Sequence, residues 1–177
     1  KVLLIGELER ILNKNLNDGF ILDAHIAQNE EQRLIMWERR EAAAEISLLK
    51  TPLINNDIAV PLDKVSKFLN VMEKKLPDLD PDADVLIVSH LGDGNVHYTV
   101  WPSKDDEKHK DKIMEAIETV VLTLGGSFSA EHGIGLSKLS SMERRKDRVS
   151  LDVMRQIKNA IDPEDIMNPG KVLPKVH

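Results

Sequence analysis

The chain has 177 residues, of which 41% are hydrophobic and 31% are charged, a composition typical of a folded globular domain and not of a disordered or fibrous chain. It contains no cysteine, which excludes disulfides, cysteine-based zinc sites and thiol catalysis. Its 24 basic and 30 acidic residues give a net charge of −6, so neither nucleic acid nor an anionic membrane surface is an expected partner. We expect a small molecule or another protein instead.

No apolar run approaches the roughly 18 residues that a membrane-spanning helix needs. The apolar opening at residues 1–5 is too short for a signal peptide. We therefore predict a protein without a transmembrane segment that is cytoplasmic, or in the mitochondrial matrix if its source is a eukaryote. The chain does not begin with Met, so we expect it to be a piece of a longer protein.

The first third of the chain alternates helical and extended patterns. Apolar residues at helical spacing predict a helix from about Leu8 that ends at Gly19, and residues 20–27 are predicted to form a strand. Asn29 with Gln32 three residues later is a capping-box pattern. It predicts a long helix that ends near residue 50, because Pro52 disfavours helical geometry in the residue before it.

The rest of the chain predicts strands at 53–60, 85–91 and 96–101, with a turn over 92–95. Helices are predicted after Pro61, over about 105–124 and over about 150–161, with loops at 77–84 and 131–135. The basic run 144–146 is predicted to be solvated surface. Together these elements predict an α+β fold in which helices cover one face of a largely antiparallel sheet.

Two histidines flank the predicted turn. If residues 92–95 form the loop, His90 lies directly opposite His97, with Cβ atoms about 4.5 to 5.5 Å apart. Two imidazoles at that separation can bind one metal ion, since histidine is a common ligand of divalent transition metals. The alternative is a pair of half-buried histidines that hydrogen-bond to the backbone.

A second candidate cluster is the loop in which Glu131 and His132 are adjacent and are followed by Gly133 and Gly135. Glycines allow such a loop to approach a neighbouring group closely. In an extended segment neighbouring side chains point in opposite directions, so Glu131 and His132 could serve different partners. The alternative is an ordinary exposed loop.

Three motifs together resemble a known family. The segments 90–97 (HLGDGNVH), 131–135 (EHGIG) and 168–171 (NPGK) resemble the C-terminal domain of FAD-linked 2-hydroxyacid oxidases and dehydrogenases. That family includes D-2-hydroxyglutarate dehydrogenase, D-lactate dehydrogenase and the flavin subunit of glycolate oxidase. The resemblance runs from about residue 20 to 173. It implies that residues 1–177 are one ferredoxin-like C-terminal substrate and metal domain, and that the FAD-binding domain of the same protein lies outside this chain.

The resemblance also implies roles for individual residues. His90, His97 and Glu131 match the family's ligands for a divalent metal, for which we expect zinc, with manganese as the alternative, and His132 matches the catalytic base. Arg40, in the motif 37–41 (WERRE), matches the contact to the substrate carboxylate. We also expect Asn55 and Thr99 to contact the substrate, and Asn95, Asn168 and Lys171 to contact the cofactor. The chain departs from the family at two positions. D-2-hydroxyglutarate dehydrogenases have a Thr and a Lys there, which the resemblance links to a second carboxylate of the substrate, whereas this chain has Ala44 and Asn55.

The function that the resemblance implies is oxidation of a D-2-hydroxy acid to a 2-oxo acid by hydride transfer to FAD. The chain by itself is then an inactive fragment of an FAD-dependent dehydrogenase or oxidase. Two alternatives remain open at this point. One is a metallohydrolase that uses the same ligands, and the other is a non-catalytic, metal-stabilised binding module. The sequence does not identify the hydroxy acid or the electron acceptor, and it leaves a homodimer open.

Overall fold

The computed structural model describes residues 2–175, without the side chains of residues 2, 3, 43 and 44. The side chain of Ala44, which departs from the dehydrogenase pattern, therefore lies outside the described part. The chain forms two compact units, Lys1–Ala43 and Ala44–His177. Within residues 2–175 no helix is long and apolar enough to cross a membrane.

The first unit contains α1 (Val2–Asn17) and most of α2 (Glu30–Ile46). As predicted, the Asn29 side chain accepts a hydrogen bond from the backbone N–H of Gln32 at the start of α2, at 2.9 Å. The predicted strand at 20–27 is wrong, because this segment joins no sheet and leaves Phe20 77% and Leu22 99% exposed. A strand needs a neighbour for its backbone N–H and C=O groups, and the described part of this unit offers none.

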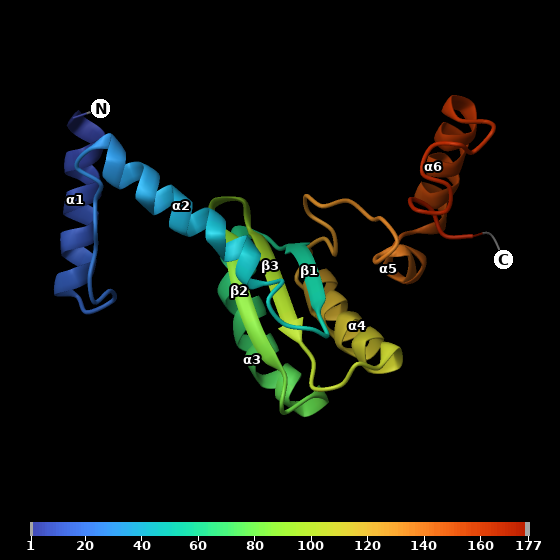
Figure 1. Cartoon of the computed structure of the whole chain (residues 1–177), viewed down its shortest axis with the longest axis horizontal. Coiled ribbons are helices and arrows are strands. Elements are labelled where there is room, and N and C mark those ends of the chain that lie inside the picture. Colours follow the sequence, from blue (N-terminus) through green and yellow to red (C-terminus); the bar gives the residue numbers. More distant parts are fainter. Residues whose placement is uncertain (1, 176–177) are drawn as a thin grey trace. The chain divides into compact units, whose positions relative to one another are not determined.

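The second unit is built on a three-stranded antiparallel sheet (Figure 1) of β1 (Ile54–Ala59), β2 (Asp84–His90) and β3 (Asn95–Trp101). The strand order is β1-β3-β2, so β3 is central. Ser127 forms an isolated antiparallel bridge with Ala59 of β1, at the position where a fourth strand would follow. This is the β-α-β-β-α-β plan of a ferredoxin-like fold, with the last strand reduced to one bridge. The α+β prediction is confirmed.

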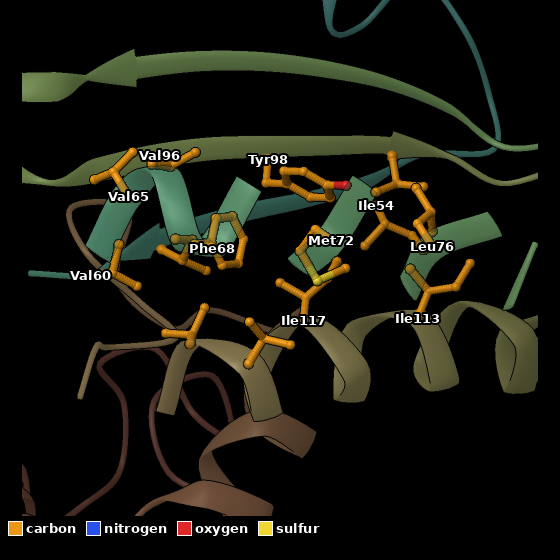
Figure 2. Close-up of a cluster of buried hydrophobic side chains, with 14 residues drawn as sticks. Ile54, Val60, Val65, Phe68, Met72, Leu76, Val96, Tyr98, Ile113 and Ile117 are labelled. Atoms are coloured by element: carbon orange, nitrogen blue, oxygen red, sulfur yellow. The ribbon is translucent and has the colours of Figure 1, made fainter. Parts of the chain in front are cut away.

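Two helices cover one face of this sheet: α3 (Val65–Leu79), entered through a short 3-10 turn at Leu62–Lys64, and α4 (Glu107–Thr123). Figure 2 shows the core between sheet and helices, where Phe68 and Met72 of α3 are fully buried and the Phe68 ring meets the Tyr98 ring edge-on, with centroids 5.5 Å apart. Because side chains alternate along a strand, Val96, Tyr98 and Val100 point into this core. His97 and Thr99 therefore point to the opposite face.

Helix α3 runs further than the predicted boundary, because Pro77 lies inside its last turn and the helix ends at Leu79. A proline there removes only one helical hydrogen bond. Burial of Leu76 in the core and the bond from the Asp80 N–H to the Leu76 carbonyl hold that turn in place. The predicted loop over 77–84 is thereby shortened to residues 80–83.

The C-terminal part contains α5 (Leu139–Arg145) and α6 (Arg148–Ile161), which is capped by the side chain of Asp147. The seven-residue α5 was not predicted. The basic run over 144–146 is not solvated as expected, because Arg144 and Arg145 both reach the buried carboxylate of Glu118 on α4, at 3.3 and 2.9 Å. Ser141 donates a third hydrogen bond to the same carboxylate. These contacts attach α5 to α4.

Candidate metal centre

The hairpin of β2 and β3 brings His90 and His97 together, but in a register two residues away from the predicted one. Val88 pairs with His97, and His90 pairs with Asn95. The loop is therefore 91–94 instead of 92–95, because residues 91–93 form a 3-10 turn that Gly94 closes with a left-handed φ of 70°. A shift of two residues keeps both histidines on one face of the sheet. Their ring centroids lie 5.6 Å apart, with the ring planes at 74°.

The loop after Ser127 brings Glu131 to this histidine pair. Its Oε1 atom lies 2.8 Å from His97 Nε2, 3.7 Å from His90 Nε2 and 3.8 Å from His132 Nε2. The His132 ring stacks on the His97 ring, with centroids 5.1 Å apart and the planes at 25°. Three imidazole nitrogens thus surround one carboxylate oxygen on the face of the sheet that α3 and α4 leave uncovered.

A buried carboxylate supports this loop from the sheet. Asp57 of β1 pairs with His97 in register, and its side chain is fully buried. Its Oδ2 atom accepts hydrogen bonds from the backbone N–H groups of Glu131 and His132, at 2.9 and 2.8 Å, and from the Lys138 ammonium at 3.3 Å. Burial raises the pKa of Asp57, but the two N–H groups and the Lys138 charge outweigh that effect and hold the pKa below its usual value.

The donor set suits a metal ion. Asp57, His97, Glu131 and His132 each offer one ligand atom, and these atoms lie within 4.8 Å of one another. Among residues 2–175, these four side chains form the one cluster of three or more potential ligands that could hold a cation. Imidazole and carboxylate together are the ligands of zinc and of manganese in proteins. Two of the three predicted ligands, His97 and Glu131, belong to the set, and His90 lies beside it.

The other predicted residues fall in several places. Thr99 is buried two residues from His97 on the same face, and Asn55 of β1 pairs with it but is exposed. Asn95 is buried and its amide donates to Asp57 Oδ1 at 3.3 Å, while its own Oδ1 has no hydrogen-bond partner among the described residues. Arg40 lies on α2 in the first unit. The exposed pair Asn168 and Lys171 shares a turn after α6.

Sequence reasoning missed Asp57 and Lys138 as parts of this site, and it gave Ser129, at the start of the candidate loop, no role. The Lys138 ammonium contacts both Asp57 and the Ser129 hydroxyl, at 3.3 and 2.9 Å. The available signal was a charged residue in the middle of a strand that is otherwise apolar or neutral (INNDIA), since a carboxylate is seldom fully buried unless it is paired. Nothing in the sequence marks Lys138 as its partner, 81 residues away.

Comparison with known proteins assigns the chain to a family. The sequence profile described as "FAD linked oxidases, C-terminal domain" matches residues 5–172. The chain belongs to this family. A probable mitochondrial D-2-hydroxyglutarate dehydrogenase of Oryza sativa subsp. indica is 34% identical over 174 residues, which cover 96% of this chain and 30% of that protein. The family predicted from the three motifs is thereby confirmed.

Two bacterial relatives agree with this assignment. D-2-hydroxyglutarate dehydrogenase of Stutzerimonas stutzeri is 34% identical over 164 residues, covering 89% of this chain and 35% of that protein. The glycolate oxidase subunit GlcD of Bacillus subtilis is 31% identical over 163 residues, covering 89% of this chain and 34% of that protein. The chain spans about a third of the length of the curated relatives it matches. The relatives are oxidoreductases of the FAD-linked hydroxyacid class.

Proposed function

We propose that this chain is the metal- and substrate-binding part of an FAD-dependent enzyme that oxidises a D-2-hydroxy acid to a 2-oxo acid. The observation that carries the proposal is the convergence of the Nε2 atoms of His90, His97 and His132 within 2.8 to 3.8 Å of Glu131 Oε1. FAD is supplied mainly by another domain of the same protein, in keeping with the family to which the chain belongs. The names of the relatives favour this class over a metallohydrolase or a non-catalytic module.

In this proposal His90, His97 and Glu131 hold the metal and His132 does not. The lone pair of an imidazole nitrogen lies in the ring plane, so two histidines bind one ion only where their planes meet. The planes of His90 and His97 cross at 74°, which allows a common ligand position near both rings. The His132 plane is nearly parallel to that of His97, and two nearly parallel planes do not meet close to the rings. This arrangement supports His132 as a separate group.

The roles of the side chains follow from their chemistry. A divalent metal held by His90, His97 and Glu131 would supply Lewis acidity toward the substrate hydroxyl, and FAD would supply the hydride acceptor. His132, whose side chain is half exposed beside the cluster, takes the hydroxyl proton at Nε2. Arg40 binds the substrate carboxylate, because a planar guanidinium can donate two parallel hydrogen bonds to it. Thr99 and Asn55 contact the rest of the substrate.

Three residues are assigned to the flavin side of the site. The orphaned Oδ1 of Asn95 is an acceptor buried next to the cluster, and a buried acceptor without a partner is costly unless a ligand or water satisfies it. Asn168 and Lys171 present an exposed polar turn.

The cellular compartment, cytoplasm or mitochondrial matrix, remains a prediction. The Oryza relative is named mitochondrial, and other relatives are bacterial.

The kinetic test uses the full-length flavoprotein from which this segment comes. Replacing the proposed base, His132→Gln, should slow flavin reduction by 2-hydroxy acids by about 10² to 10⁴-fold, the usual range for loss of a positioned general base. Metal content should stay at the wild-type level. The matched control is His25→Gln, an exposed histidine of the first unit, which should reduce its flavin normally. Stopped-flow reduction of His132→Gln at the wild-type rate would assign the base to another residue.

A further inference from the structure

The loop that carries Glu131 and His132 is folded around the carboxylate of Asp57. Three consecutive backbone N–H groups, those of residues 130, 131 and 132, donate to the single oxygen Asp57 Oδ2, at 3.2, 2.9 and 2.8 Å. The backbone carbonyl of Asp57 also accepts from the Ala130 N–H at 3.1 Å. Successive N–H groups that point into one concavity form an anion-binding nest. Here the protein's own strand fills that nest.

Lys138 links the same carboxylate to the other side of the loop. Its ammonium contacts Asp57 Oδ2 and the Ser129 hydroxyl, and that hydroxyl donates to the Gly133 carbonyl at 2.8 Å. The Lys138 residue is only 8% exposed, so its charge depends on Asp57 for compensation. Residues 130–132 therefore bond to Asp57, and Ser129 bonds to Lys138, so this segment is attached to one buried ion pair. That segment contains the two side chains on which the proposed chemistry depends.

Asp57 offers one oxygen to the donor set, but the protein itself already occupies most of its carboxylate. Its side chain has no exposed surface, and Oδ2 already has four donors, three backbone N–H groups and one ammonium. Oδ1 accepts from the buried amide of Asn95 and lies 3.9 Å from His97 Nδ1. The carboxylate thus bonds to the backbone of Glu131 and lies near the ring of His97. These are two of the three proposed metal ligands.

We infer that Asp57 is the positioning residue of this centre. It holds the N–H groups of residues 130–132 and the Lys138 ammonium, and it thereby sets the positions of Glu131 and His132 relative to His97. The inference rests on the proposed function of the cluster as a metal site. An asparagine at position 57 keeps the shape of the side chain but has one acceptor oxygen instead of two. Its amide oxygen is uncharged, so it accepts hydrogen bonds from the loop more weakly than a carboxylate and does not compensate the Lys138 charge. The loop is then held less firmly.

The experiment measures Co²⁺ affinity and the visible spectrum of the bound Co²⁺ in the 177-residue chain, together with unfolding in urea. Asp57→Asn should weaken Co²⁺ binding by about 10 to 100-fold, the usual effect of removing a group that orients metal ligands, and should change the spectrum. The matched control is Asp80→Asn. Asp80 is an equally buried aspartate that accepts from the Ser103 N–H and contacts His109. This control should lose stability but keep the wild-type Co²⁺ affinity and spectrum.

A double variant separates positioning from stability. Asp57→Asn alone leaves the Lys138 ammonium buried without a counter-charge, which is strongly destabilising. Asp57→Asn with Lys138→Met removes both charges, so it should regain stability relative to Asp57→Asn while its Co²⁺ affinity stays low. It also keeps the test decisive if the single variant does not fold. Wild-type Co²⁺ affinity in the double variant would overturn the positioning role. Absence of Co²⁺ binding by the wild-type chain would instead overturn the metal site, and this inference with it.

Discussion

The arginine assigned to the substrate carboxylate lies in a row of exposed charged residues on α2. Arg40 is partly buried, whereas its neighbour Arg39 is exposed, and Arg40 Nη1 lies 3.7 Å from the Glu41 carboxylate. Arg40 is thus the less exposed of the two adjacent arginines. Surface arginines more often form solvent-screened ion pairs that contribute little, so the assignment rests mainly on the motif WERRE.

Replacing this arginine by lysine tests the assignment. Arg40→Lys in the full-length enzyme should raise KM for every 2-hydroxy acid by about 10 to 100-fold, since a single ammonium does not reproduce two parallel hydrogen bonds worth about 1.5 to 3 kcal/mol. Arg39→Lys is the matched control and should leave KM unchanged. Steady-state kinetics with a monocarboxylic and a dicarboxylic hydroxy acid measure both. Equal KM values for wild type and Arg40→Lys would contradict the role.

At the residue scale, the sequence predicted correctly which face of the sheet carries the histidine pair, but it did not predict the hairpin register. His90 and His97 were correctly placed on one face, because a register shift of two residues preserves the face. The register itself was wrong, since it depends on where the 3-10 turn closes, at Gly94 and not at Asn95. Asp57 could not be found from spacing, because the side chains and N–H groups that bond to it are 38 to 81 residues away in sequence.

Among the elements, the hairpin turn fixes where His90 lies. The turn ends at Gly94, whose φ is 70° and where an added Cβ would come within 2.1 Å of the Val60 carbonyl oxygen. That contact is with backbone, so it can be relieved only by moving the hairpin away from the segment after β1. Glycine is therefore required at 94, although Gly92 in the same turn has open space around it.

The two glycines provide a paired test of the turn. Gly94→Ala should lower the free energy of unfolding by at least about 2 kcal/mol, because left-handed strain alone costs about 1 to 2 kcal/mol and the backbone clash adds to it. Gly92→Ala should be neutral or slightly stabilising, since it restricts only the unfolded chain. Urea unfolding measures both variants. Equal stability of the two would show that the turn tolerates a side chain at 94.

The end of α3 is held by a buried aspartate whose charge makes stability depend on pH. Burial raises the pKa of Asp80, but hydrogen bonds from His109 and from Ser103 outweigh it and lower the pKa from 3.8 to about 2. Because the folded-state pKa is depressed, the charged form stabilises the fold. That contribution, about 2 kcal/mol by linkage, is complete above about pH 5 and is lost as the pH falls through 4 towards 2.

The expected result is a loss of unfolding free energy between pH 5 and pH 2.5 that depends on Asp80. Asp80→Asn should be less stable than wild type at pH 5, and the difference between the two should shrink as the pH falls, because wild-type Asp80 is then protonated as well. Urea unfolding at four or five pH values measures the difference. A difference that stays constant down to pH 2.5 would contradict the role given to Asp80.

At the scale of the whole molecule, the sequence predicted the α+β layers because helix and strand periods differ clearly in residues 53–124. It failed for segment 20–27, which has a strand-like pattern but pairs with no strand in the part of the chain that the structure describes. It also failed for α5, since seven residues are too few for a helical pattern to be recognised. Glu118 and its arginine partners hold α5 through long-range ion pairs that no local pattern encodes.

The central claim is that His90, His97 and Glu131 bind one divalent metal. The most direct measurement is the zinc content and affinity of the chelator-free 177-residue chain, compared with His90→Ala, His97→Ala and the exposed control His25→Ala. We predict about one bound zinc for wild type and for His25→Ala, as in a mononuclear site with histidine and carboxylate ligands. Binding should be at least about tenfold weaker in the other two variants. Wild-type zinc content and affinity in a His90→Ala/His97→Ala double variant would contradict the claim.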